Sequence, residues 1–303
     1  MHIERPVTSF PSNHRDQVND IALNFLGNRL ATCSSDGFIH IQDVSEQTPR
    51  HLATISGHSQ PVLRMSWSPN GLLASVGTSG LLMVHQESSD NPAVYELIYK
   101  FDHQSPVTGV SFFQNPLPNQ PCLVATCCED ASIHIFQQSG DDFHHRKYQS
   151  HSSPCTCISF HDSVHLLASG SKNGEIIIWM EKDDAFKPAF QLSTHSSSIV
   201  DLSFAPSHSI PSTRILASCS VDGTVLVFSG DDSGFNHEEV TTEAVGVSRV
   251  GWSESGVALF VMSTVPTVWS RVGGFWQSLG QLSVRPEMAT SQVPRFGSSG
   301  GVI

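Results

Sequence analysis

Five histidines recur along the chain at a spacing of about 45 residues, each followed by Ser or Thr and, in all but the second repeat, by an Asp or Asn in a predicted turn. They are His14, His58, His103, His151 and His195, and the acidic or amide residues of the predicted turns are Asp36, Asp130, Asn173 and Asp222. Imidazole, hydroxyl and carboxylate groups together could bind a metal or carry out acid–base catalysis. That chemistry needs one convergent site, whereas these residues occur once per repeat. We therefore predict a buried hydrogen-bond network within each repeat, in which the histidine contacts the turn residue and a hydroxyl such as Ser34 or Ser220.

Two cysteines near one of these histidines suggest a zinc site. Cys155 and Cys157 follow His151, and thiolates together with an imidazole are zinc ligands. No second ligand pair at the usual spacing accompanies them, and residues two apart on a strand share one face. We therefore predict that both cysteines pack inside the protein, and we predict no catalytic, metal or cofactor site.

Composition excludes several classes of function. The formal net charge is −12, and no stretch gathers Lys and Arg into the basic stripe that nucleic-acid binding requires. No apolar run approaches the roughly 20 residues of a membrane span, and Met1–Phe10 lacks the apolar core of a signal peptide. The seven cysteines show no disulfide-scaffold spacing, which is typical of a reducing compartment. We expect a cytoplasmic protein with no transmembrane segment and no direct contact with nucleic acid.

Each of the five histidines begins the same pattern of alternating residues. An apolar residue or Cys follows four positions later, a second apolar residue three positions after that, and a bulky residue two positions further on. These three sets are Val18, Val62, Val107, Cys155 and Ile199; Ile21, Met65, Val110, Ile158 and Leu202; and Leu23, Trp67, Phe112, Phe160 and Phe204. The spacing predicts a half-buried strand in every repeat.

Three further strands are predicted in each unit. A strand of small residues such as Leu30–Ser34 is followed by a turn such as Asp36-Gly37, then by a strand such as Phe38–Gln42 and a less regular strand. A sixth unit without the histidine begins at Glu243 and keeps the register. Four antiparallel strands per unit predict an all-β, six-bladed WD-repeat β-propeller over residues 1–281, with repeats starting near 14, 58, 103, 151, 195 and 243. Residues 282–303 lack an apolar period and are predicted to be a disordered tail.

Several segments resemble one particular family of propellers. Those segments are Leu30–Asp36 in the first repeat, His195-Ser196, Ala205–Ser207 and Ile215–Gly223 in the fifth, and Val250–Ser253, Val268-Trp269 and Gly274–Trp276 in the sixth. They are similar to the Sec-thirteen family, the small propeller subunit of the outer COPII vesicle coat. The resemblance covers about residues 14–280, while the second and third repeats match only the general pattern.

This resemblance implies a non-catalytic scaffold subunit of the coat that carries cargo from the endoplasmic reticulum to the Golgi. Members of the family form an open six-bladed propeller, and a partner inserts a further blade between the first and last blades. The implied partners are the helical-solenoid subunit of the COPII outer cage and the corresponding nucleoporin of the nuclear-pore Y-complex. Members also occur in a nutrient-signalling complex. The implied location is cytoplasmic, at endoplasmic reticulum exit sites and on vesicles, or at the nuclear pore.

The expected insertion site directs attention to apolar residues of the first and sixth repeats. The candidates for partner contact are Leu23, Phe25 and Ile41 in blade one and Val250, Trp252, Trp269 and Trp276 in blade six. An inserted blade would bury its faces against these residues, and backbone pairing would add affinity.

Two other functions fit the repeat pattern less well. A substrate receptor for a cullin-type ubiquitin ligase is also a WD-repeat docking module, but such receptors carry Trp-Asp-x-Arg after a blade's third strand. Here the matching positions read Trp179-Met180-Glu181-Lys182 and Trp269-Ser270-Arg271-Val272. An enzymatic propeller would need a cleft with convergent ionisable groups, and the chain has no Gly-rich phosphate loop, Gly-x-Ser-x-Gly or His-Glu-x-x-His sequence.

Overall fold

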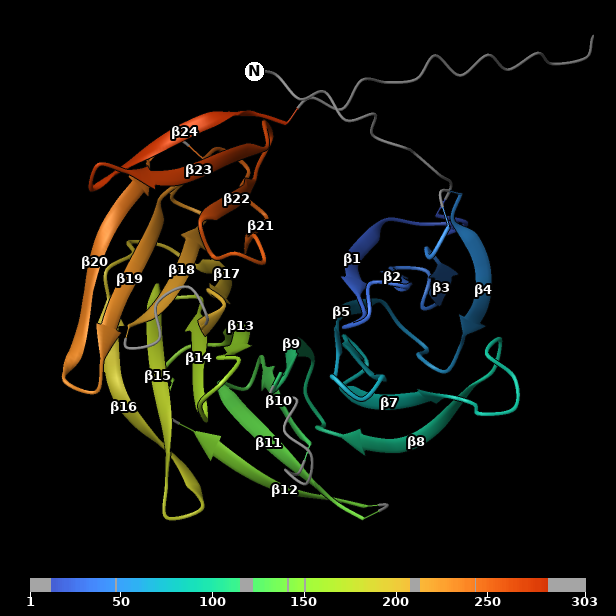
Figure 1. Cartoon of the computed structure of the whole chain (residues 1–303). Coiled ribbons are helices and arrows are strands. Elements are labelled where there is room, and N and C mark those ends of the chain that lie inside the picture. Colours follow the sequence, from blue (N-terminus) through green and yellow to red (C-terminus); the bar gives the residue numbers. More distant parts are fainter. Residues whose placement is uncertain are drawn as a thin grey trace, which may run out of the picture.

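The computed structural model describes residues 12–46, 48–114, 122–140, 142–149, 151–207, 213–242 and 244–282. Within these ranges the regular structure is entirely β, arranged as six four-stranded antiparallel sheets around a central channel (Figure 1). The prediction of an all-β, six-bladed propeller is therefore confirmed. None of the described residues forms a helix long and apolar enough to cross a membrane. The predicted tail, apart from Leu282, lies outside the described residues.

Every blade is built from four consecutive strands, from the channel outward. Blade one contains β1 (Val18–Leu23), β2 (Arg29–Ser34), β3 (Ile39–Asp43) and β4 (Arg50–Ile55), and blade two contains β5 (Val62–Trp67), β6 (Leu72–Gly77), β7 (Leu81–Glu87) and β8 (Tyr95–Asp102). Blade three contains β9 (Val107–Phe112), β10 (Leu123–Cys128), β11 (Ser132–Ser139) and β12 (Asp142–Gln149), and blade four contains β13 (Cys155–Phe160), β14 (Leu166–Ser171), β15 (Glu175–Lys182) and β16 (Ala185–Ser193). Blade five contains β17 (Ile199–Phe204), β18 (Arg214–Ser220), β19 (Val225–Asp231) and β20 (Gly234–Thr241), and blade six contains β21 (Arg249–Trp252), β22 (Ala258–Met262), β23 (Thr267–Val272) and β24 (Phe275–Gln281).

The backbone conformation of the turn between the second and third strands requires a positive φ angle. In blades one and five the predicted Asp-Gly sequences place Gly37 at φ 81° and Gly223 at φ 85°, a conformation that costs glycine little. Blade three has Ala131 at the same place with φ 67°, so an L-residue there takes the left-handed conformation. The short turn keeps the second and third strands in register.

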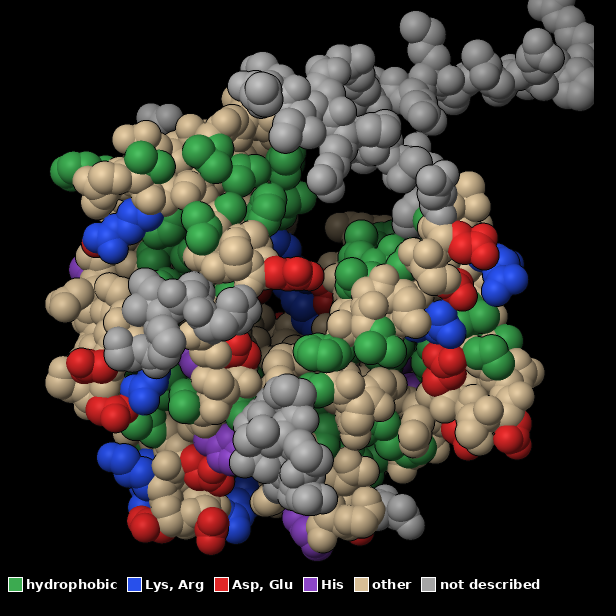
Figure 2. All heavy atoms as spheres, viewed as in Figure 1, with side chains coloured by type: hydrophobic (Ala, Val, Ile, Leu, Met, Phe, Trp, Pro, Cys, Tyr) green, Lys and Arg blue, Asp and Glu red, His purple; other side chains and the backbone are tan. Residues whose placement is uncertain are grey.

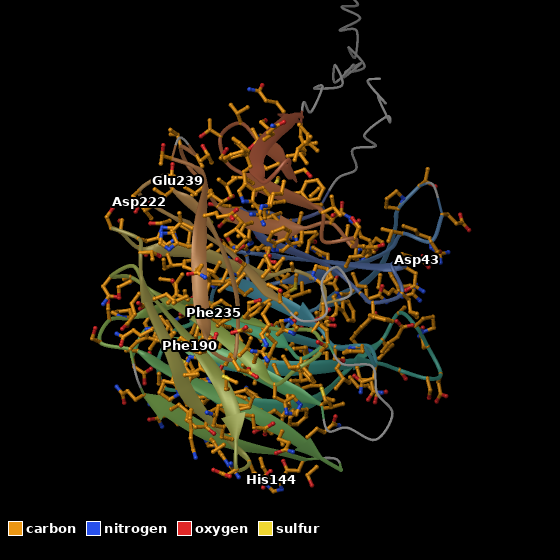
Figure 3. The ribbon with its side chains drawn as sticks, turned by 60° about the vertical axis from the view of Figure 1, so that its left-hand side comes forward. Asp43, His144, Phe190, Asp222, Phe235 and Glu239 are labelled. Carbon is orange, nitrogen blue, oxygen red and sulfur yellow. The ribbon has the colours of Figure 1, made fainter. Side chains whose placement is uncertain are left out.

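Consecutive blades are joined by hydrophobic clusters that each draw residues from two blades. Such clusters link blades one and two, two and three, three and four, four and five, and five and six. The outer strands also meet, as where the rings of Phe190 in β16 and Phe235 in β20 lie 5.6 Å apart (Figure 3). The apolar core of this protein therefore lies between consecutive blades, where the facing sides of two sheets are buried against each other.

No comparable cluster joins blade six to blade one among the described residues. Figure 1 shows these two blades separated at the top of the ring, and Figure 2 shows hydrophobic side chains on both sides of the hollow between them. The ring is therefore open at one junction. We call this place the open junction and the other five the closed junctions.

Candidate functional site: the open junction

The recurrent histidines are the most regular polar feature of the closed side of the ring. In blades one to five the Nε2 atom of the histidine lies within 3.0 Å of a hydroxyl oxygen on the second strand. The pairs are His14–Thr32, His58–Ser75, His103–Thr126, His151–Ser169 and His195–Ser218. This corrects the expected hydroxyls: Ser34 and Ser220 instead accept the backbone N–H of the turn residue that follows them. Each histidine thus ties the start of its blade to the second strand.

The other ring nitrogen, Nδ1, meets a different partner in each blade. The partners are Asp36 (3.1 Å), the Ser79 hydroxyl (3.5 Å), the Gly80 carbonyl (3.0 Å), Glu175 (2.9 Å) and the Thr224 hydroxyl (2.6 Å). Of the four predicted turn residues, the structure brings only Asp36 directly to its histidine. The variation shows that this half of the network tolerates several acceptors.

The other three turn residues bind elsewhere. Asp130 accepts from Lys147 Nζ at 2.7 Å, and Asn173 donates to the Ser152 hydroxyl at 3.1 Å, because Glu175 occupies the position beside His151. An Asp222 carboxylate oxygen lies 3.9 Å from His195 and reaches it through Thr224. Partial burial would raise the pKa of Asp222, but hydrogen bonds from Thr224 and Ser196 outweigh it and lower that pKa.

Burial sets the charge of three of the network histidines. Removal from water disfavours the imidazolium, and it lowers the pKa of His58, His103 and His195 to about 4. Each of these rings is therefore neutral at pH 7 and is held by hydrogen bonds on both sides. The arrangement stabilises blades, and its members lie in separate blades around the ring.

Cys155 and Cys157 also pack inside the protein, but the prediction that they share one face of the strand was wrong. A bulge between Cys155 and Cys157 turns them to opposite faces of β13: Cys155 packs against blade three and Cys157 against blade five. They do not share a face as predicted, because the extra residue shifts the alternation. Burial raises the pKa of Cys157 to about 12, so its sulfur is a thiol.

A buried trio in blade three has the composition of a metal site. Ligand atoms of His103, Cys128 and His134 lie within 4.8 Å of one another. Both ring nitrogens of His103 already have partners, namely Thr126 and Gly80, and burial raises the pKa of Cys128 to about 12. As arranged here, the trio is a set of neutral packing groups.

Exposure distinguishes the open junction from the closed ones. On each inner strand two apolar residues face the preceding blade, and in blades two to five both are no more than 9 % exposed. Those buried residues are Met65, Trp67, Val110, Phe112, Ile158, Phe160, Leu202 and Phe204. The equivalent residues of blade one are Ile21, 62 % exposed, and Leu23, 54 % exposed. Blade one presents to solvent the side chains that its counterparts bury.

The predicted contact residues divide into two groups. Leu23 and Phe25 are exposed on blade one, at the inner strand and the turn after it. The other five are corrected by the structure, because they belong to closed junctions: Ile41 lies in the cluster of blades one and two, and Val250, Trp252, Trp269 and Trp276 lie in the cluster of blades five and six. Val250 and Trp252 occupy the positions of Ile21 and Leu23, so they face the preceding blade, which for blade six is blade five.

The blade-six wall of the open junction consists of residues that the sequence analysis did not select. The second strand carries two residues that face the following blade, and in blades one to five these are Ala31 and Cys33, Ala74 and Val76, Ala125 and Cys127, Ala168 and Gly170, and Ala217 and Cys219. In blade six the same positions hold Phe260 and Met262, and Met262 is 40 % exposed. Large residues at positions that are otherwise small were the available signal for this wall.

Charged side chains lie at the inner end of the open junction. Arg249 of β21 donates from Nη2 to Asp20 Oδ1 of β1 at 2.8 Å, and it also reaches the Asn19 carbonyl oxygen at 3.4 Å. A cavity of about 130 Å³ lies beside them and is lined in part by Arg64 and Asp201. Blades six and one therefore meet at the channel, while their apolar faces stay apart.

Comparison with known proteins agrees with this architecture. The family model described as "WD domain, G-beta repeat" matches residues 4–43, 49–86, 95–137, 144–180 and 186–229. Blade six lies beyond the matched ranges, although the structure gives it the same four strands.

Similar whole proteins carry one recurring name. A protein transport protein sec13 from Emericella nidulans is 27 % identical over 282 residues, covering 82 % of this chain and 89 % of its own. SEC13 homologues from Drosophila melanogaster and Dictyostelium discoideum are 28 % and 27 % identical, each over 82 % of this chain and over 76 % and 89 % of their own. The resemblance found in the sequence is confirmed. The chain belongs to the WD-repeat family of β-propellers, as a relative of the Sec13 proteins.

Proposed function

We propose that the chain is a non-catalytic scaffold subunit of the COPII outer coat, which binds the helical-solenoid subunit of that coat by accepting a blade from it. The observation that carries the proposal is the exposure of Ile21 and Leu23, whose counterparts in blades two to five are buried by a neighbouring blade. These two positions have the residue types of a blade interface and lack the neighbouring blade.

The shape and chemistry of the open junction support a sheet as the occupant. One wall carries the edge strand β1 with Ile21 and Leu23, and the other carries Phe260 and Met262. A β-sheet inserted there would bury both walls, as neighbouring blades do elsewhere in the ring. Interfaces formed by a whole inserted blade with apolar faces usually belong to permanent complexes and bury upwards of about 2,000 Å². The isolated chain should therefore be poorly soluble without its partner.

The names of the similar proteins support a role in transport. One is called a protein transport protein and another a SEC13 homolog, and a role in protein transport fits a vesicle coat. The protein would then act on the cytoplasmic side of exit sites and vesicles. The corresponding nucleoporin of the Y-complex is the alternative partner, and the experiment below separates the two.

The test is co-expression with the blade-forming segment of each candidate partner from the same organism, followed by co-purification and size-exclusion chromatography. We expect the coat segment to be retained in a one-to-one complex and to increase the soluble yield. Ile21→Asp should abolish retention, because a charge would be buried at the interface. Leu97→Asp is the matched control, since Leu97 is an exposed apolar residue of β8, in blade two. Retention of the nucleoporin segment alone would reassign the assembly, and equal retention by Ile21→Asp would contradict the insertion site.

A further inference from the structure

Each closed junction contains a hydrogen bond from a backbone N–H to a side chain on the preceding blade's inner strand. The donors and acceptors are Met65 to Asp20, Phe112 to Ser66, Phe160 to Ser111, Phe204 to Ser159, and Val250 to Asp201, at 2.9 to 3.4 Å. The acceptor is always a carboxylate or a hydroxyl. An inner strand therefore provides an acceptor for the blade that follows it.

Blade six cannot provide that acceptor. At the position of Asp20 and Asp201 its inner strand carries Arg249, whose guanidinium only donates, and at the serine position it carries Gly251, which has no side chain. The direction of bonding is reversed here, because Arg249 donates to Asp20 on the following blade. Among the described residues, the open junction is thus the one at which the preceding inner strand offers no side-chain acceptor to the blade that follows.

Asp20 shows how one carboxylate can serve both of its neighbours. Its Oδ2 accepts the N–H of Met65 from blade two at 2.9 Å, and its Oδ1 accepts Arg249 from blade six at 2.8 Å. Asp20 and Arg249 are both partly buried, and their side chains are 12 % and 26 % exposed, respectively. The same geometry moved back by one blade would place a carboxylate between Arg249 and the N–H of Ile21, which is the equivalent of Met65.

We propose that the inner strand of the inserted blade carries an Asp or Glu that takes Arg249 from Asp20 and accepts the N–H of Ile21. This inference rests on the proposed function and adds the chemistry by which the partner is selected. A blade with an uncharged residue at that position would separate Arg249 from Asp20 and remove the carboxylate that the guanidinium now binds. Such an arrangement is costly for a buried charge. Arg249 therefore selects acidic inner strands among the sheets that could fill the junction.

The experiment titrates the wild-type chain and its variants with the purified blade-forming segment of the coat's helical-solenoid subunit, by isothermal titration calorimetry. Arg249→Glu should lower the affinity at least about 30-fold, since it places the new carboxylate of residue 249 against the acidic residue of the segment at a buried contact. Arg249→Gln should lower it less. Arg64→Gln is the matched control, because Arg64 occupies the same inner-strand position in blade two; it should stay within about threefold of wild type. Circular dichroism melting verifies that each variant is folded.

A second arm identifies the partner carboxylate. Each Asp and Glu of the segment's inner strand is replaced singly by Asn or Gln, and each is titrated against wild type and Arg249→Gln. One replacement should weaken binding to wild type and change binding to Arg249→Gln little, the signature of a coupled pair. Replacing the identified acidic residue of the segment by Arg should restore binding to the Arg249→Glu variant. If the wild-type chain fails to bind the segment, the proposed function is wrong; if it binds and Arg249→Glu binds equally well, only this inference is overturned.

Discussion

The closed side of the ring and the open junction use the same repeat positions in opposite ways. At the closed junctions, small residues such as Ala125 and Cys127 allow the next blade to pack closely, and a bulky residue such as Phe160 fills the space from the other side. At the open junction the equivalent wall residues are Phe260 and Met262 on one blade and the exposed Leu23 on the other. The comparison teaches that a repeat position has a fixed direction, toward the preceding or the following blade, and that its role depends on whether a blade is there.

Acidification should have the largest effect on stability, and it acts on the closed side. Burial lowers the pKa of His85, His103 and His195 to about 4 and that of His134 to about 3, so these rings are neutral when folded. The unfolded chain binds their protons near pH 6.5, and stability is therefore full above that pH and falls as the pH drops toward 4. Each histidine should cost about 1.4 kcal/mol per pH unit in this range.

The measurement is the free energy of unfolding by urea between pH 8 and pH 4.5. We expect a loss of several kcal/mol below pH 6.5, sufficient to unfold the chain. His85→Gln is the useful control, because a side chain that does not titrate should reduce the slope by roughly one proton. A stability that stays flat down to pH 5 would show that these histidines are not buried in solution.

The blade count and the strand order could be predicted from the sequence. Which face of a strand meets the preceding blade could not. The spacing of the histidines and the register of Val250 and Trp252 located all six blades, including the one beyond the family model's match. Alternation along a strand defines two faces, but it does not state which face meets the preceding blade. For this reason Trp252 was predicted at the open junction, whereas it packs against blade five.

Two contacts were missed for different reasons. The bulge that separates Cys155 from Cys157 recurs at the same inner-strand position in blades one to five. Its signal in the sequence was the three-residue step between the first and second apolar positions of each repeat, which strict alternation does not allow. The acceptor beside His151 is Glu175 because the turn of blade four directs that side chain inward, and Asn173 contacts Ser152 instead. Such choices among nearby polar groups are settled by packing geometry.

The next largest effect should come from truncating the same repeat position at a closed junction and at the open junction. Phe112→Ala removes a ring that is 1 % exposed in the cluster of blades two and three, and it should cost about 3–5 kcal/mol of unfolding free energy. Leu23→Ala changes the equivalent, exposed residue of blade one and should cost less than about 1 kcal/mol. Denaturant unfolding of the partner-free chain measures both. Equal losses would mean that the ring closes on itself in solution.

A smaller effect should separate a strong histidine network from a weak one. His151 contacts Glu175 at 2.9 Å and Ser169, which also accepts from Trp179, whereas His58 has Ser75 and the distant Ser79. His151→Ala should cost about 1–3 kcal/mol, because the Oε2 atom of the buried Glu175 carboxylate loses its donor, and His58→Ala should cost about 1 kcal/mol or less. His195→Ala should resemble His151→Ala. Thermal melting of the three variants decides the order, and a larger shift for His58→Ala would refute it.

The smallest expected effect is a gain, produced by giving blade two the acid that blade one has. Ser79 lies 3.5 Å from His58 Nδ1 and occupies the turn position of Asp36, which accepts His14, the N–H of Arg15 and the N–H of Phe38. Ser79→Asp should recreate these three bonds with His58 and its turn, and it should stabilise the chain by about 1 kcal/mol at pH 7.5. The matched control is Ser79→Asn, which keeps the size and removes the charge. A gain for Asp alone would show that charge assistance matters in this network; no gain for either would show that Ser79 and its surroundings already satisfy His58, so that the blades differ in composition without differing in strength.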